Sequence, residues 1–338
     1  MKKKKILLLS DDLRMHSGIA TVSKDIVMET LNEYDWVQLA GAIKHPDKGK
    51  VFDMSDGLNE FGIKDGYLRV YPVDGYGDEA VLREVMELEK PDAILHYTDP
   101  RFWIWLYRME AEIRRNIPIF YYNIWDDLPD PQYNTDYYKS SDLLMSISKQ
   151  TYGINNRLLP EYEDWQTTYV PHGISSRRFS KIEDTDDDLK EFNDRFGLTD
   201  KTFRVLYSNR NIRRKMPGDV ALAFKYFVEG LPEEQRDDCV MIFHCSPSDA
   251  NGTDLPKLCR DLMPECNVAF TYEINKGQPF HDGMMNKLFN SADVYVNMAS
   301  NEGFGLGSAE ALTVGTPIIV NMTGGMQDQC GVRDDEGN

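Results

Sequence analysis

The sequence has few of the features that mark a secreted, metal-binding or membrane-spanning protein. Five cysteines occur among its 338 residues, all from Cys239 onward, and none forms a C-x-x-C pair. Because disulfide frameworks and zinc sites need paired, closely spaced cysteines, we expect free thiols and a reducing compartment. No apolar run approaches the ~20 residues that a membrane-spanning helix needs.

Motifs for several common chemistries are also missing. The turn after the first predicted strand, residues 10–18, contains no G-x-G-x-x-G, which disfavours a dinucleotide site. The chain has no Walker A pattern and no recognisable Ser-His-Asp or Cys-His nucleophile. Its six histidines are scattered without metal-ligand spacing.

The chain has fewer basic than acidic residues. The chain has 56 acidic and 38 basic residues and a net charge of -18, which disfavours binding to nucleic acid by general electrostatics. A local basic groove remains compatible with that balance. Four lysines at residues 2–5 precede an apolar run too short for a signal peptide, so we expect a first strand and a cytoplasmic protein. A peripheral position at an anionic membrane surface is the less favoured interpretation of these lysines.

What is present is a regular alternation of strand and helix patterns, typical of parallel sheets with crossover helices. We predict a doubly wound domain over residues 1–170, a linker over 171–202 and a second domain over 203–338. The acidic run at residues 183–188 is interpreted as a solvated linker or a helix cap. Five strands are predicted for the second domain, forming one parallel sheet, at residues 203–208, 240–245, 268–272, 293–297 and 318–320. The polar residues 334–338 stand where a closing element is expected, so we expect a truncated C-terminal end.

One stretch organises the second domain, a glycine-rich turn and short helix at residues 301–312 between two predicted strands. Glycines let the backbone approach a ligand closely, and the free N–H groups of a helix start favour phosphate. Glu302 and Glu310 flank this anion site. Since phosphate repels a carboxylate, the two glutamates are better suited to hydroxyl groups. The stretch therefore indicates a nucleotide-linked sugar.

A second stretch, residues 208–217, places four cations at the end of the domain's first strand. They are Arg210, Arg213, Arg214 and Lys215. Arginine can bind two oxygens at once and lysine adds a point charge, a combination that suits a diphosphate. The alternative is a basic surface turn, which we disfavour in so acidic a chain.

Together these motifs resemble the group-1 family of retaining glycosyltransferases. The resemblance rests on Arg210 and Lys215, five residues apart, on the Glu-x7-Glu element that starts at Glu302, and on Gly315-Thr316-Pro317. It covers essentially the whole chain. It implies the GT-B architecture, in which two Rossmann-like domains face a central cleft.

The resemblance also implies roles for individual residues. Glu310 would hold the ribose hydroxyls and Glu302 the transferred sugar, while Arg210 and Lys215 would neutralise the departing diphosphate. It implies no metal or other cofactor, since those cations do the metal's work and the nucleotide-sugar is a substrate. The remaining donor contacts that it implies are Gly18, Tyr272, Ile274, Gly303, Phe304, Gly305 and Leu306.

The first domain departs from the family pattern. Many relatives carry a histidine after the strand at residues 117–122, where this chain has Asn123 to Asp127. Asp126 or Asp127, or His96 on a neighbouring strand, is a candidate to face the sugar, and each is equally a loop-capping residue. Most aromatic residues nearby have core spacing, and Trp125, in a predicted loop, best suits sugar stacking.

We therefore predict a glycosyltransferase that moves a hexose or pentose from a nucleotide-sugar to an unidentified acceptor, with retention. The acceptor is a glycan, a lipid, a small molecule or a modified base. Three alternatives stay open: a nucleotide-sugar epimerase of the same architecture, a transferase acting on modified nucleic-acid bases, and a non-catalytic subunit.

Overall fold

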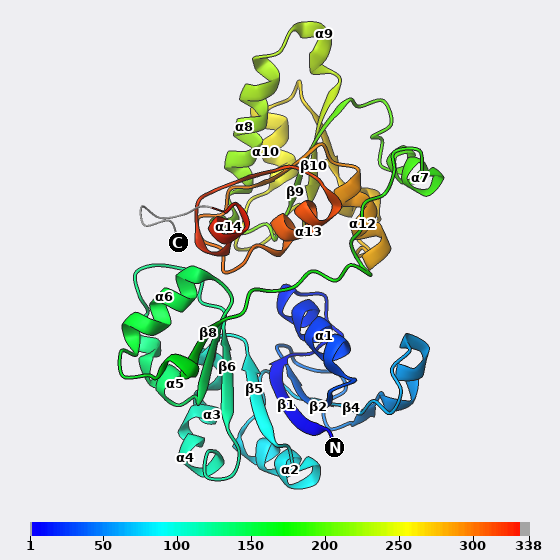
Figure 1. Ribbon diagram of the computed structural model, residues 1–338. Helices are drawn as coiled ribbons and strands as arrows, with labels where there is room; N and C mark the ends of the chain where they lie inside the picture. The colour runs from blue at the N-terminus through cyan, green and yellow to red at the C-terminus, as the bar shows by residue number, and fades with distance from the viewer. Residues whose placement is uncertain (1, 332–338) are drawn as a thin grey trace. The chain divides into compact units, whose positions relative to one another are not determined.

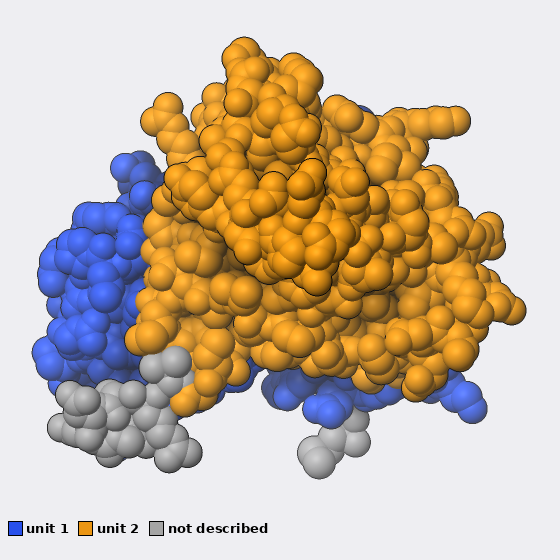
Figure 2. Space-filling view, turned by 90° about the horizontal axis from the view of Figure 1, so that it is seen from above, with its two compact units in different colours: residues 1–172 blue, residues 173–338 orange. Residues whose placement is uncertain are grey.

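The protein is described by a computed structural model that covers residues 2–331. The chain divides into two compact units, residues 1–172 and 173–338 (Figure 2). Each unit is built around one sheet, as the predicted pair of Rossmann-like domains requires (Figure 1). Residues 334–338, where we expected a closing element, lie outside the described residues.

Unit 1 has an eight-stranded sheet in the order β3-β4-β2-β1-β5-β6-β7-β8. All neighbouring strands are parallel except β3 and β4, which are antiparallel. Its strands are β1 (Lys4–Asp11), β2 (Tyr34–Gly41), β3 (Phe52–Asp53), β4 (Leu68–Pro72), β5 (Ala93–Tyr97), β6 (Ile119–Asn123), β7 (Leu143–Ser146) and β8 (Thr167–Tyr169).

Helices α1 and α2 of unit 1 each begin after a residue whose side chain caps the helix N-terminus. The side chain of Ser17 accepts a hydrogen bond from the Ala20 N–H at the start of α1, and Asp78 caps α2 in the same way. Residues 100–113 form three short helical pieces and not one long helix, because residues 102–106 are all apolar and cannot share one face of a straight helix. The unit's helices are α1 (Gly18–Thr30), η1 (Ser55–Phe61), α2 (Glu79–Glu89), η2 (Pro100–Trp103), α3 (Ile104–Arg108), α4 (Glu110–Ile113), η3 (Gln132–Asn134), α5 (Thr135–Lys139), α6 (Lys149–Leu158) and η4 (Asp164–Gln166).

Unit 2 has the five-stranded parallel sheet that the sequence predicts, in the order β11-β10-β9-β12-β13. Alternate residues of its strands face opposite layers: Val205 and Tyr207 pack with α8 and α10, and Leu206 packs with α12 and α13. Burial of both faces explains why these strands read as continuous apolar runs. The strands are β9 (Phe203–Ser208), β10 (Cys239–His244), β11 (Asn267–Phe270), β12 (Val294–Asn297) and β13 (Ile318–Val320).

The helices of unit 2 cover both faces of this sheet (Figure 1). None of the helices within residues 2–331 is long and apolar enough to cross a membrane. The unit's helices are α7 (Asp187–Arg195), η5 (Arg213–Lys215), α8 (Pro217–Glu229), α9 (Glu233–Arg236), α10 (Leu255–Leu262), α11 (Thr271–Ile274), α12 (Asp282–Asn290), α13 (Leu306–Val314) and α14 (Gly324–Gln329).

Part of the segment expected to be a linker, residues 171–202, is folded onto unit 2. Helix α7 begins after Asp186, whose side chain accepts a hydrogen bond from the Leu189 N–H, so the acidic run serves as a helix cap. Phe192 from α7 and Phe196 just beyond it are buried in the core of unit 2. Apolar residues at helical spacing therefore outweigh the acidic run that suggested a solvated linker.

Candidate active site

Two turns meet at the carboxyl end of the sheet of unit 2. The basic turn (residues 209–216) follows β9, and the glycine turn (residues 298–305) follows β12. Strands β9 and β12 are parallel neighbours, with Tyr295 opposite Leu206. Because parallel neighbours end at the same edge, the topology brings together two turns that are far apart in the sequence. This edge is where ligands bind in open α/β sheets.

Several hydrogen bonds join the two turns. Lys215 donates a hydrogen bond from Nζ to Oε2 of Glu302, and the two side chains are only 7% and 15% exposed. The Arg214 guanidinium donates to the Asn301 carbonyl over 2.8 Å, and the Ser300 N–H donates to the Arg214 carbonyl over 2.8 Å. The structure thus places two predicted site residues, Lys215 and Glu302, in direct contact.

Tyr295, a buried residue of β12, supports the junction of the two turns through its hydroxyl. The Tyr295 hydroxyl donates to the Ser208 carbonyl over 3.1 Å and accepts from Asn209 Nδ2 over 3.2 Å. Burial raises the pKa of Tyr295, and the nearby carboxylates of Glu302 and Glu310 raise it further, so the phenol stays protonated. Both predicted glutamates therefore lie in the electrostatic surroundings of one side chain.

A short helix that the sequence analysis missed, α14, packs behind the glycine turn. The Gly325 N–H donates to the carbonyls of Glu302 and Gly303, over 3.2 and 3.1 Å. Gln329 Nε2 donates to the carbonyls of Phe304 and Gly305, over 2.6 and 3.2 Å. Four consecutive carbonyls of the turn are thus satisfied by α14. The adjacent glycines after β13 were the signal in the sequence for this close approach.

Helix α13 starts at the end of the glycine turn. Its N-cap, Gly305, has a φ of 89°, a left-handed conformation that favours glycine. The first N–H groups of the helix, from Leu306 onward, have no partner inside the helix. The Ser308 hydroxyl in the same helical turn is buried and has no hydrogen-bond partner among the residues that the structure describes. This helix start offers donors to an anion.

The outer part of the basic turn is held by the loop after β10. Arg210 is mostly exposed, and its Nε donates to Asp249 Oδ2 over 3.1 Å. The Asn251 N–H and Arg210 lower the pKa of Asp249, so this carboxylate stays charged. Asn211 is fully buried and donates to the Thr253 carbonyl over 2.7 Å. Sequence reasoning missed both residues: Asn211 lies among the cations of the basic turn but carries no charge, and Asp249 lies in a loop that carries no motif.

Two of the predicted donor contacts, Tyr272 and Ile274, lie in α11, directly after β11. Tyr272 is 45% exposed, and Ile274 packs against the core of unit 2. His244 ends β10, and its Nδ1 lies 2.8 Å from the Thr271 hydroxyl. Burial lowers the pKa of His244 to about 4, so its imidazole is neutral at pH 7. No sequence spacing distinguishes His244 from the other five histidines, so sequence reasoning does not identify it.

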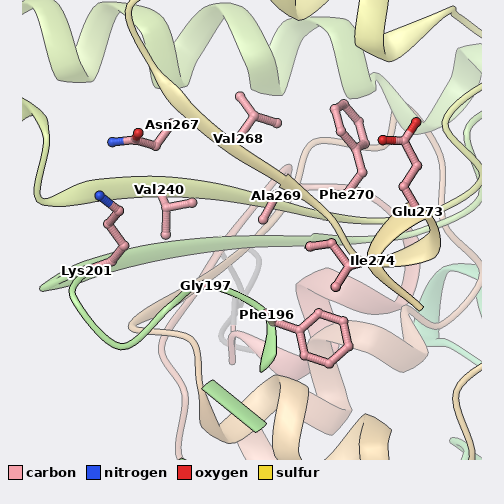
Figure 3. A pocket seen from close by; sticks show the side chains of 10 residues that line it. All are labelled: Phe196, Gly197, Lys201, Val240, Asn267, Val268, Ala269, Phe270, Glu273 and Ile274. Atoms are coloured by element: carbon pink, nitrogen blue, oxygen red, sulfur yellow. The ribbon is translucent and has the colours of Figure 1, made fainter. Parts of the chain in front are cut away.

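A pocket of about 310 Å³ runs along the edge strand β11 (Figure 3). Lys201 and Asn267 lie at one end, and Glu273 and Ile274 lie at the other. Of the predicted site residues only Ile274 lines it, so the pocket is separate from the two turns. Within residues 2–331, histidine, cysteine and carboxylate side chains form no group of three that could hold a metal ion.

In unit 1, Gly18 is the exposed first residue of α1, at the carboxyl end of β1. The loop that leads to it is fixed by Asp11, which accepts from the Ser17 and Tyr76 hydroxyls over 3.1 and 3.2 Å. Burial raises the pKa of Asp11 above its ordinary value. Asp126 lies partly exposed in the loop after β6, and its role stays a prediction.

His96 does not lie where a group that contacts substrate would lie. It is completely buried, with Nδ1 2.6 Å from the Tyr107 hydroxyl and its ring stacked on Tyr121. Burial lowers the pKa of His96 to about 3. The catalytic role of His96 stays a prediction, and the structure places its ring among those of Trp103, Tyr107 and Tyr121. The sequence showed its position on the strand but not which face it occupies.

Comparison with known proteins agrees with this geometry. Residues 190–335 match the family model of group 1 glycosyl transferases. The alpha-monoglucosyldiacylglycerol synthase of Acholeplasma laidlawii is 26% identical over 187 residues, 55% of this chain and 43% of the relative. The chain thus spans less than half the length of the curated relatives it matches.

Solved structures show the fold. A sucrose-phosphate synthase from Thermosynechococcus elongatus superimposes with a TM-score of 0.70 at 14% identity, over 96% of this chain and 83% of its own. An E. coli structure described as trehalose-6-phosphate bound with UDP-2-fluoro glucose gives 0.66 at 12% identity, over 96% and 86%. The predicted GT-B fold of two Rossmann-like domains is confirmed.

Proposed function

We propose that the protein transfers a sugar from a nucleotide-sugar to an acceptor hydroxyl, because residues 190–335 match the family model of group 1 glycosyl transferases. The observation that carries the proposal is the junction of the two turns. There Lys215 contacts Glu302 at the carboxyl edge of the sheet, beside the start of α13. A cation, a carboxylate and free N–H groups in one place match the diphosphate and hydroxyls of such a donor.

The charges of the site are arranged for a leaving diphosphate. In the transfer, the acceptor oxygen bonds to the anomeric carbon as that carbon's bond to the diphosphate oxygen breaks. The diphosphate leaves with the electron pair, and the hydroxyl proton passes to it or to solvent. Lys215 and Arg210 stabilise the charge that develops on the leaving oxygen, with the N–H groups at the start of α13. With these donors in place we propose a metal-independent reaction.

Each of the two glutamates would bind a different sugar of the donor, either the transferred sugar or the ribose. Glu302 is held by Lys215 at the end of the glycine turn, where it can accept from hydroxyls of the transferred sugar. Glu310 lies in the second turn of α13, suited to the ribose hydroxyls. Tyr272 and Ile274 in α11 would border the base. Gly303 to Leu306 would present N–H groups to the sugar and diphosphate, and Gly18 would do so from unit 1.

Transfer with retention is the stereochemistry that we propose, in keeping with the family that the motifs resemble. A solved structure of the same fold bound with UDP-2-fluoro glucose supports a UDP-sugar as the first donor to test.

A donor panel tests the proposal. Purified protein is mixed with UDP-, GDP- and ADP-sugars, and unfolding temperature and products are measured. A bound donor raises the unfolding temperature by mass action, and slow donor hydrolysis releases the nucleoside diphosphate. We expect both effects with one nucleotide class. A donor returned with an inverted sugar carbon would instead identify an epimerase, and no shift with any donor would contradict the proposal.

A further inference from the structure

Exposed aromatic side chains gather at the carboxyl end of the sheet of unit 1. Phe102 follows β5 and is 57% exposed, and Tyr133 follows β6 and is 63% exposed. Arg101, the residue before Phe102, lies over the Trp125 ring at 5.4 Å, and Trp125 meets Tyr133 edge-on at 5.8 Å. We name these four residues the aromatic platform. Exposed large rings are costly in water, so a cluster of them indicates a ligand.

The platform is rigid. Phe102 stacks on Tyr76 with ring centres 5.3 Å apart and an angle of 11°, and Tyr76 is itself tied to Asp11. The Trp125 indole N–H donates to the Asp127 carbonyl over 2.8 Å. Fixed rings lose little conformational entropy when a ligand binds, which makes them efficient contacts.

The charges around the platform exclude several ligand classes. Arg101 is held by both oxygens of Asp99, and Arg157 by both oxygens of Asp130. Asp127 adds an exposed carboxylate in the same loop. With its arginines paired and carboxylates at its edge, the surface repels phosphates, including those of nucleic acid and anionic lipid.

We propose that the aromatic platform binds a neutral carbohydrate, the acceptor of the transferred sugar. The C–H groups on one face of a pyranose ring pack well on the electron-rich face of an aromatic ring. Neighbouring carboxylates then accept hydrogen bonds from the hydroxyls at the edge of the sugar. This inference rests on the proposed glycosyl transfer, which requires an acceptor.

The test measures saccharide binding directly, by saturation-transfer NMR on the full chain without donor. The probes are methyl α-D-glucopyranoside and maltose, with glucose 6-phosphate, adenosine and phosphatidylglycerol vesicles as competing classes. Variants Phe102→Ala and Tyr133→Ala are compared with Phe61→Ala and Trp165→Ala. Those controls remove equally exposed rings, 61% and 69%, elsewhere on unit 1.

We expect the neutral saccharides to bind the wild type, and about tenfold weaker binding in each platform variant, the loss of one aromatic contact of ~1.4 kcal/mol. The control variants should keep wild-type affinity. Equal losses in controls and platform variants, or preferred binding of the phosphate, nucleoside or vesicle probe, would overturn the proposal. A protein that binds saccharide but no nucleotide-sugar would instead overturn the proposed function and leave the platform standing.

Discussion

The carboxyl edges of the two sheets are built from different chemistry. In unit 2 that edge consists of charges and backbone, with Lys215 against Glu302 and a glycine turn backed by α14. In unit 1 it consists of rings, some exposed like Phe102 and some closed over a buried His96. The difference teaches that one fold can present a site for a charged donor on one sheet and a neutral surface on another. Each edge can be broken separately by substitution.

The largest effect is expected at the Lys215–Glu302 pair. Lys215→Met removes the cation, and we expect at least about a hundredfold loss of transfer rate, the usual effect of one lost charge-stabilising donor. It also leaves Glu302 buried without its partner, at a cost of about 3 kcal/mol of unfolding free energy. Urea denaturation and an assay of nucleoside diphosphate release measure the two losses.

A double variant separates stability from function. Lys215→Met with Glu302→Gln removes both charges, so most of the unfolding free energy should return while transfer stays lost. Recovery of activity together with stability would mean that the pair is structural only.

The next effect is expected at the start of α13, directly after the glycine turn. A Cβ added at Gly307 would lie 2.4 Å from the Tyr295 hydroxyl oxygen, so Gly307→Ala must displace the start of α13. We expect about 1–3 kcal/mol of destabilisation and a marked loss of donor affinity. Gly218→Ala is the matched control: its Cβ would meet only Leu258 at 3.6 Å, and alanine in a helix gains up to about 1 kcal/mol. Equal donor affinity in both variants would contradict the account.

Local patterns in the sequence predict part of the site of unit 2, and contacts between distant loops decide the rest. The strand–glycine–helix pattern around Glu302 and the cations near Arg210 are local, so both turns and their sheet could be predicted. Asp249 and the α14 contact depend on which loops meet at the sheet edge, and no local pattern encodes that. The burial of His96 could not be predicted for a related reason: its position on the strand is local, but its burial depends on aromatic residues from other elements.

The smallest effect on transfer is expected from His96, in unit 1. Its pKa of about 3 lies below the ordinary value of 6.5, so the unfolded chain binds its proton more readily. Its stabilising contribution is present above pH 6.5 and is lost as pH falls towards 3, at about 1.4 kcal/mol per unit.

His96→Phe should therefore flatten the dependence of unfolding free energy on pH between 6 and 4, while transfer persists. A urea titration at several pH values measures the slope, with the exposed His16→Gln as control. An unchanged slope, or loss of transfer in a folded His96→Phe protein, would restore His96 as a functional group.

The central claim is that the edge of unit 2 holds a nucleoside diphosphate, and a calorimetric titration tests it most directly. Wild-type protein and the Lys215→Met, Glu302→Gln double variant are titrated with UDP, GDP and ADP under identical salt. We predict that one nucleotide binds the wild type and that its affinity falls at least about tenfold in the double variant, the effect of one charge-assisted contact. Equal affinity in both proteins would contradict the assignment of this edge as the donor site.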